Sequence, residues 1–185
     1  RINPGDKNHQ IQNTEKILAV DSKNLKVKKK IVKVYNSITK KIKISNSIEE
    51  AETAKVIENI QRDLNIALMN DIFIFCKKMD LDFKNILALA RTKWNFLKFN
   101  PGLVGGHCLP VDPYYLSFIA KKNNISLETV LAGRSVNSKL KSFIFDQIKK
   151  KIFNFKKKSK KNCRVLISGI TYKKNVADIR NSYAL

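Results

Sequence analysis

The sequence predicts a mainly α-helical protein whose helical middle is flanked by partial α/β pieces at both ends. Residues 47–79 contain neither Gly nor Pro and carry apolar side chains at helical spacing, so they predict one long helix. Short apolar runs near both ends have the alternation of strands. We therefore divide the chain into residues 1–45, 46–160 and 161–185, of which the middle segment is a helical domain.

The first 45 residues have the pattern of an α/β unit. Residues 17–20 form a short apolar run, residues 24–38 have helical spacing, and residues 42–44 alternate like a strand. Two short strands and one helix cannot close a hydrophobic core by themselves. We therefore expect this segment to be the tail of a larger α/β domain.

The long helix has a start signal and one apolar face. Ser47 and Glu50, three residues apart, form a capping-box signature. The apolar residues lie close to one helical stripe: Val56, Ile60, Leu64, Ala67, Leu68, Ile72, Phe75 and Met79. A helix of this length exceeds the usual globular helix and normally packs on another helix. We expect a homodimer built on it, because one chain offers too little surface to cover the stripe.

Three shorter helical segments follow the long one. Residues 82–92 form the first. Asp112 then looks like an N-cap, since Pro113 at the next position suits the first turn of a helix. Residues 126–155 form the last segment, with Ser126 as its expected N-cap. These segments make the middle of the chain helical.

Residues 163–169 have the pattern of a buried strand that ends in a Gly turn. A second α/β domain would begin in this way. We expect both ends of the chain to be pieces of larger domains, and only the helical middle to be whole.

The chain is strongly basic, with 37 Lys and Arg against 15 Asp and Glu and a formal net charge of +22. Such a charge is typical of proteins that bind nucleic acid or acidic membranes. The excess is mostly Lys spread over the whole chain, and even the densest stretch, residues 149–161, fits a solvated helix end that runs into a linker. We therefore expect no nucleic-acid partner and no membrane partner.

The cysteines and the hydropathy indicate a soluble cytoplasmic protein. Cys76, Cys108 and Cys163 lie far apart and show no CxxC spacing, so neither a disulfide framework nor a zinc site is expected. Two His residues give no metal site either. The sequence has no uninterrupted apolar run of the length of a membrane span and no signal-peptide pattern at its start.

Glycine and proline, which permit or impose special backbone conformations, are concentrated in residues 100–113 around one thiol, Cys108. This segment holds three of the six glycines and three of the four prolines. Glycines let a ligand approach backbone N–H groups, and a helix that starts at Asp112 directs its positive end towards Cys108. This setting favours a nucleophilic thiolate. The loop chemistry alone leaves a second interpretation equally open, in which Cys108 is a buried structural residue.

Three other polar residues are candidates for the same site. His107 is adjacent to Cys108, but neighbouring residues of an extended loop point in different directions, so we interpret it as a loop-ordering or ligand-contacting group rather than a base. Lys55 and Asn59 are four residues apart and share one helix face, where they could hold an oxyanion. Their spacing alone fits two exposed polar residues equally well.

Several segments together resemble the UDP-glucose/GDP-mannose dehydrogenase family, in particular its bacterial UDP-N-acetylhexosamine 6-dehydrogenases of surface-polysaccharide synthesis. The resemblance is carried by residues 53–67, 92–96 and 101–108. Residues 1–7 are similar to the end of the family's NAD domain, and residues 171–182 to the opening of its nucleotide-binding domain. The segments follow in the family's order. The resemblance implies that both flanks belong to Rossmann-like α/β domains.

The resemblance also implies a reaction, the NAD-dependent two-step oxidation of the C6 alcohol of a UDP-sugar to a carboxylate. Cys108 would carry the sugar as a thiohemiacetal and then a thioester. Lys55 and Asn59 match the pair that stabilises the C6 oxygen, and Asp112 matches the carboxylate that handles the proton or activates water. Other matches imply that Arg180 lies near the cofactor and that the UDP-sugar contacts Lys173 and a loop made of Phe99, Asn100, Pro101, Gly102, Leu103, Val104 and Gly105.

The sequence departs from the family's pattern in two ways. No GxGxxG occurs in these 185 residues, so we expect the main NAD site to lie outside them and the isolated chain to be inactive. Relatives often carry a basic residue where Asn100 stands.

Two other functions compete with the enzyme: a basic helical module for nucleic acid or membranes centred on residues 139–161, and a non-catalytic helical dimer core.

Overall fold

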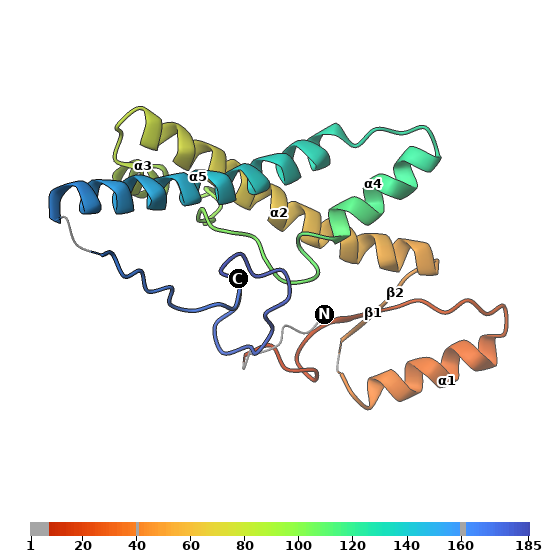
Figure 1. Ribbon diagram of the computed structural model, residues 1–185. Helices are drawn as coiled ribbons and strands as arrows, with labels where there is room; N and C mark the ends of the chain where they lie inside the picture. Colours follow the sequence, from red (N-terminus) through yellow and green to blue (C-terminus); the bar gives the residue numbers. More distant parts are fainter. Residues whose placement is uncertain (1–7, 40, 160–161) are drawn as a thin grey trace. The chain divides into compact units, whose positions relative to one another are not determined.

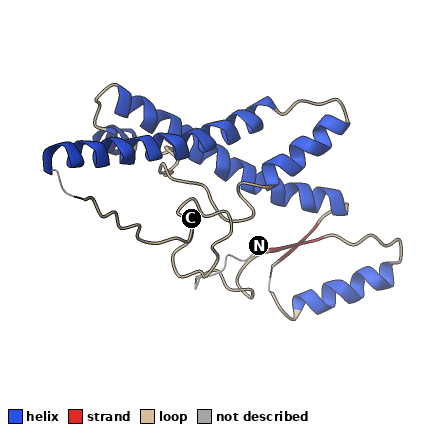
Figure 2. Ribbon diagram, viewed as in Figure 1, coloured by secondary structure: helices blue, strands red, loops and turns tan. Residues whose placement is uncertain are grey.

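The structure is a computed structural model that describes residues 8–39, 41–159 and 162–185. Two short strands and five helices are found among these residues (Figures 1 and 2). The chain divides into two compact units, one of Arg1–Glu58 with Lys173–Ala177, the other of Asn59–Tyr172 with Asp178–Leu185. The prediction of a mainly helical protein is confirmed, whereas the Rossmann-like nature of the flanks stays a prediction.

The first unit contains a small β-α-β arrangement. Strands β1 (Lys16–Leu18) and β2 (Ile42–Ile44) pair in parallel, and helix α1 (Leu25–Asn36) connects them. The N-cap of α1 is Asn24, whose side chain accepts a hydrogen bond of 2.9 Å from the Lys26 amide. Parallel strands need such a crossover connection. The strand–helix–strand pattern predicted for the N-terminal segment is therefore present.

Helix α2 (Ile48–Lys78) is the predicted long helix, and it starts in the first unit and continues in the second. Ser47 Oγ accepts a hydrogen bond of 3.1 Å from the Glu50 amide, as a capping box requires. The Glu50 carboxylate reaches back to the amide of Asn46 at 3.2 Å, one residue before the cap. The start signal in the sequence was therefore interpreted correctly.

The second unit packs three further helices with α2. Helix α3 (Phe83–Ala90) lies within the predicted helix of residues 82–92 and is capped by Asp82, and α4 (Asp112–Lys122) and α5 (Glu128–Ser159) follow. Phe73 of α2 meets Phe83 and Phe143 edge to face, with ring centroids 5.4 and 6.2 Å away. These contacts join α2 to both α3 and α5.

Helices α2 and α5 also approach each other closely at Gly133. A Cβ at this position would lie only 2.4 Å from Leu64 Cδ2 and 3.7 Å from Ala67 Cβ. Leu140, about two turns further along α5, is 1% exposed. The core of the second unit therefore lies along the α2–α5 contact.

Two predictions about the C-terminal part were wrong. Residues 163–169 form no strand, and Leu166 is 90% exposed. A strand needs a hydrogen-bonded neighbour, and the described part of the chain pairs none with this segment. Helix α5 begins at Glu128 rather than directly after Ser126 and extends past residue 155, because no Gly or Pro interrupts it there.

Within the described ranges, no helix carries an apolar stretch long enough to span a membrane.

Candidate active site

Cys108 lies in the turn that leads directly into α4. Its side chain is half-buried, and its carbonyl oxygen accepts hydrogen bonds from the amides of Val111, at 3.1 Å, and Asp112, at 2.8 Å. Cys108 and Asp112 are therefore held within a single turn of backbone. The thiol belongs to a residue at the N-terminal end of a helix, where the helix dipole favours negative charge.

The predicted N-cap role of Asp112 was wrong. Helix α4 starts at Asp112 itself, its N-cap is Val111, and no side chain caps it. Asp112 is only 8% exposed, and its Oδ2 accepts a hydrogen bond of 2.6 Å from Asn59 Nδ2 on α2. The carboxylate is therefore engaged with α2. The sequence suggested a cap because Asp before Pro is common at helix starts, but the Asp112 amide already makes a helical bond to Cys108.

The structure therefore brings Asn59, Cys108 and Asp112 together in the second unit. Lys55 lies four residues before Asn59 on the same helix, is exposed, and belongs to the first unit. Lys173 is half-buried and also belongs to the first unit. One helical turn separates Lys55 from Asn59 along α2, as the spacing predicted.

The loop that precedes Cys108 is held at two points by side chains from helices. Arg91, the C-cap of α3, donates from Nη2 to the Phe99 carbonyl at 3.2 Å and to Asn100 Oδ1 at 2.6 Å. Asn70 of α2 bonds both polar groups of Gly102, accepting from its amide at 2.7 Å and donating to its carbonyl at 3.1 Å. The loop is therefore fixed at its start and in its middle.

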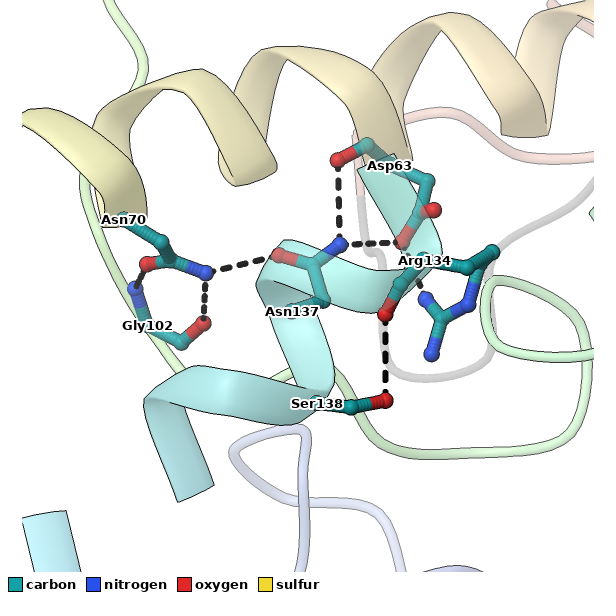
Figure 3. A network of polar contacts seen from close by, with 6 residues as sticks. All are labelled: Asp63, Asn70, Gly102, Arg134, Asn137 and Ser138. Carbon is teal, nitrogen blue, oxygen red and sulfur yellow. Dashed lines mark hydrogen bonds and ion pairs between the residues drawn. The ribbon is translucent and has the colours of Figure 1, made fainter. Parts of the chain in front are cut away.

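A buried polar network lies behind this loop (Figure 3). Asp63, Asn70, Arg134 and Asn137 are each at most 3% exposed. Asp63 Oδ1 accepts from Arg134 Nη1 at 2.5 Å and from Asn137 Nδ2 at 2.7 Å, and Asn137 Oδ1 accepts from Asn70 Nδ2 at 2.7 Å. Burial raises the pKa of Asp63, while the Arg134 charge opposes that rise.

Asp178 and Asn181 of the C-terminal segment contact the loop that holds Cys108. Asn181 Nδ2 donates to the Gly106 carbonyl at 2.9 Å, and Asp178 Oδ2 lies 3.4 Å from His107 Nδ1. Arg180 forms a two-point pair with Asp178, in which both nitrogen–oxygen distances are 2.8 Å. The hydrogen bonds from Arg180 hold the pKa of Asp178 well below its usual range. His107 thus links its loop to a carboxylate of the C-terminal segment.

Gly105 and Gly106 make this close approach possible. A Cβ at Gly105 would lie 3.1 Å from the Asn181 carbonyl oxygen and 3.3 Å from Tyr172 Cβ. Gly106 has a φ of +81°, which residues with a side chain rarely adopt. Tyr172, which packs against Gly105, is itself partly buried, and this burial raises the pKa of its hydroxyl. Because Gly105 and Gly106 have no side chains, the Cys108 loop can lie directly against Tyr172 and Asn181.

Sequence reasoning missed the polar network and the residues that hold the loop. Asp63 and Asn70 are seven residues apart and share the buried face of α2 with Ile60 and Ala67. That periodicity was a signal, because a polar residue on the apolar face of a helix needs a buried partner. Its partners, Arg134 and Asn137, are three apart on α5 and carry no such sign in the sequence.

Comparison with known proteins gives one family and a consistent set of relatives. Residues 49–139 match the UDP-glucose/GDP-mannose dehydrogenase family, central domain. Protein CapL of Staphylococcus aureus is 43% identical over 98% of this chain and 42% of its own length. The UDP-N-acetyl-D-glucosamine 6-dehydrogenase of Pseudomonas aeruginosa is 41% identical over 98% of this chain and 43% of its own length.

The fold is similar to that of a solved relative. The native structure of the UDP-N-acetyl-mannosamine dehydrogenase Cap5O from Staphylococcus aureus aligns with a TM-score of 0.74 at 27% identity. The alignment covers 94% of this chain and 38% of that chain. The chain thus spans about two fifths of the length of the relatives that it matches.

Proposed function

Because the chain belongs to the UDP-glucose/GDP-mannose dehydrogenase family through residues 49–139, we propose that it is the catalytic middle of an NAD-dependent UDP-sugar 6-dehydrogenase. Its substrate is a UDP-N-acetylhexosamine, oxidised at C6 to the uronic acid for surface-polysaccharide synthesis. The observation that carries the proposal is the hydrogen bond between Asn59 and Asp112, one turn from Cys108 and inside the matched segment. A relative that is 41% identical is named for this activity.

Cys108 is the nucleophile of the proposed reaction. Its sulfur adds to the C6 aldehyde, the carbonyl π electrons move to oxygen, and protonation of that oxygen gives the thiohemiacetal. The turn that leads into α4 holds the Cys108 backbone during this addition. The sugar stays attached to Cys108 until it has become a thioester.

Asn59 and Lys55 stabilise the C6 oxygen during these steps. A carboxamide nitrogen carries two hydrogens, so Asn59 can donate one to Asp112 and the other to the substrate oxygen. Lys55, one turn earlier on α2, adds a positive charge for the same oxygen. The two residues together form the oxyanion site of the proposal.

Asp112 is the base that activates water for release of the acid. Its carboxylate takes a proton from the water that attacks the thioester, and the Cys108 sulfur leaves as thiolate. The hydrogen bond from Asn59 keeps one carboxylate oxygen in place during this step. The same turn of backbone thus carries both the nucleophile and the base.

The loop made of residues 99–105 recognises the nucleotide-sugar, together with Lys173. The family resemblance implies a basic residue where Asn100 stands, and Arg91 places a guanidinium directly on Asn100 Oδ1. Arg91 can therefore supply the positive charge that the loop itself lacks, which suits an anionic UDP moiety.

NAD supplies the hydride acceptor when it is bound. Of the described residues, Arg180 fits a cofactor contact, because its side chain is 64% exposed, cationic and oriented by Asp178. Asp178, which orients Arg180, also lies 3.4 Å from His107, the residue next to Cys108. Arg180 would then hold the cofactor on the side of the loop where the thiol lies.

A homodimer built on α2 completes the proposal. Leu68, Phe75 and Met79 are 55%, 56% and 59% exposed, although they are large and apolar. They are seven and four residues apart, so they share one face of α2. A second copy of the same face would cover them.

Cytoplasmic location stays a prediction from the cysteine pattern.

The proposal is tested with the full-length protein that contains this chain. We expect UDP-N-acetylhexosamine and NAD to give the uronic acid, with two NADH formed for each acid. NADH absorbance and mass spectrometry of the sugar measure both quantities. Absence of NADH with the gluco, galacto and manno forms of the substrate would overturn the proposal.

A further inference from the structure

We propose that Asn70 is a positioning residue that holds the loop of residues 99–105 in the shape that binds the nucleotide-sugar. The substrate part rests on the proposed function, whereas the loop geometry does not. Asn70 lies on α2, is 0% exposed, and is separated from the loop by about thirty residues of sequence.

The contact between Asn70 and Gly102 has two points. Asn70 Oδ1 accepts from the Gly102 amide at 2.7 Å, and Nδ2 donates to the Gly102 carbonyl at 3.1 Å. A carboxamide offers a donor and an acceptor in one plane, so it can bind both polar groups of one residue. No atom lies within 4 Å of a Cβ placed on Gly102. The two hydrogen bonds with Asn70 are therefore the contacts by which the described structure ties Gly102 to α2.

The ion pair of Asp63 and Arg134 sets the orientation of the Asn70 amide. The ionised Asp63 carboxylate can only accept, so Asn137 must turn its Nδ2 towards Asp63 and its Oδ1 towards Asn70. Asn70 must then present Nδ2 to Asn137, which leaves its Oδ1 for the Gly102 amide. The direction of every bond from α5 to the loop thus follows from one buried charge (Figure 3).

A loop that is ordered before binding loses less conformational entropy when its ligand arrives. Asn70 fixes the middle of the loop and Arg91 fixes its start. Cys108 lies six residues beyond Gly102 and has its own contacts in the first turn of α4. Loss of Asn70 should therefore weaken substrate binding much more than it slows the chemical step.

The test compares Asn70→Ala with Asn65→Ala in the full-length protein. Asn65 is a matched control on the same helix, because its amide bonds the Gln61 carbonyl of α2 itself and, among the described residues, no group of the loop. In Asn70→Ala we expect amide exchange of residues 99–105 to rise about ten-fold or more, without a matching rise in α5. The KM for the UDP-sugar should rise about ten-fold, with kcat changed less than about three-fold. Asn65→Ala should leave all these quantities near wild type.

A second variant, Asn70→Asp, preserves size and the acceptor for the Gly102 amide but removes the amide donor. Because the new carboxylate oxygen faces the Gly102 carbonyl and Asn137 Oδ1, which are both acceptors, loop exchange should rise at least as far as in Asn70→Ala, and circular dichroism checks that helix content is kept. Unchanged loop exchange in Asn70→Ala, an equal rise throughout α2 and α5, or faster loop exchange with unchanged KM would overturn the proposal. If the wild-type protein does not oxidise UDP-sugars, the proposed function fails, while the exchange measurement still decides whether Asn70 holds the loop.

Discussion

Single residues carry the proposed chemistry because the first turn of α4 fixes Cys108 and Asp112 together. The Cys108 carbonyl accepts a hydrogen bond of 2.8 Å from the Asp112 amide, so the backbone holds the two residues in one turn. A reactive thiol needs a setting that favours its anion, and a helix N-terminus provides one. The proposal therefore assigns different tasks to two residues that share one turn, and separate substitutions can test them.

We predict that Cys108→Ser in the full-length protein binds the UDP-sugar but forms almost no uronic acid. A hydroxyl of similar shape stays protonated near neutral pH, so the covalent intermediate cannot form efficiently. Acid production, measured by mass spectrometry, should fall by orders of magnitude while substrate affinity, measured by calorimetry, persists. Near-normal acid production would show that the thiol is structural.

We predict that Asp112→Asn slows release of the acid and lets a covalent adduct accumulate on Cys108. The amide oxygen of Asn can still accept the hydrogen bond from Asn59, but it cannot take a proton from water. Intact-protein mass after incubation with NAD and substrate should show the adduct. The double variant with Cys108→Ser is the control and should show none; an adduct of equal size there would place it on another residue.

We predict that the Asp178 carboxyl titrates below its ordinary value of 3.8. Its pKa is lowered first by hydrogen bonds from Arg180, so the stabilisation from the ionised form is present above 3.8 and is lost as the pH falls below it. Carboxyl carbon shifts measured by NMR should give the midpoint. Arg180→Ala should raise that midpoint, and an unchanged midpoint in this variant would contradict the assigned cause.

Helices were the elements best predicted from sequence, because their signals are local. The capping box at Ser47 and the absence of Gly and Pro gave α2 close to its observed bounds, and the helix predicted over residues 82–92 contains α3. The strand expected at residues 163–169 failed because a strand depends on a neighbour that a local pattern does not contain. The same reason explains the missed contacts of Arg134 and Asn70, whose partners lie far away in sequence.

We predict that Arg134→Met destabilises the contact between α2 and α5 by about 3–5 kcal/mol, because it leaves the Asp63 carboxylate buried without its ion-pair partner. Chemical denaturation monitored by circular dichroism measures the free energy of unfolding. The double variant Asp63→Asn with Arg134→Met removes the unpaired carboxylate and should recover part of the lost free energy of unfolding. Equal stability of the single variant and wild type would show that the pair is not ionised in the folded protein.

At the scale of the whole molecule, α2 carries an exposed apolar face that a single chain leaves uncovered. Large apolar side chains on a soluble helix usually face a partner, and Leu68, Phe75 and Met79 repeat at helical spacing on one side. The opposite side of α2 bears the buried polar network, so the helix presents one face to its own chain and the other outward. An isologous pair would bring the two outward faces together.

We predict that Phe75→Glu converts the full-length protein from a dimer to a monomer. A carboxylate at the centre of an apolar interface would be buried without a partner, which costs more than the lost contacts alone. Light scattering coupled to gel filtration measures the mass. Phe153→Glu is the matched control, because Phe153 is an equally large apolar residue, 68% exposed, on a different helix, α5, and its variant should stay dimeric. A wild-type monomer, or a dimer that survives Phe75→Glu, would mean that the exposed face of α2 is covered in some other way.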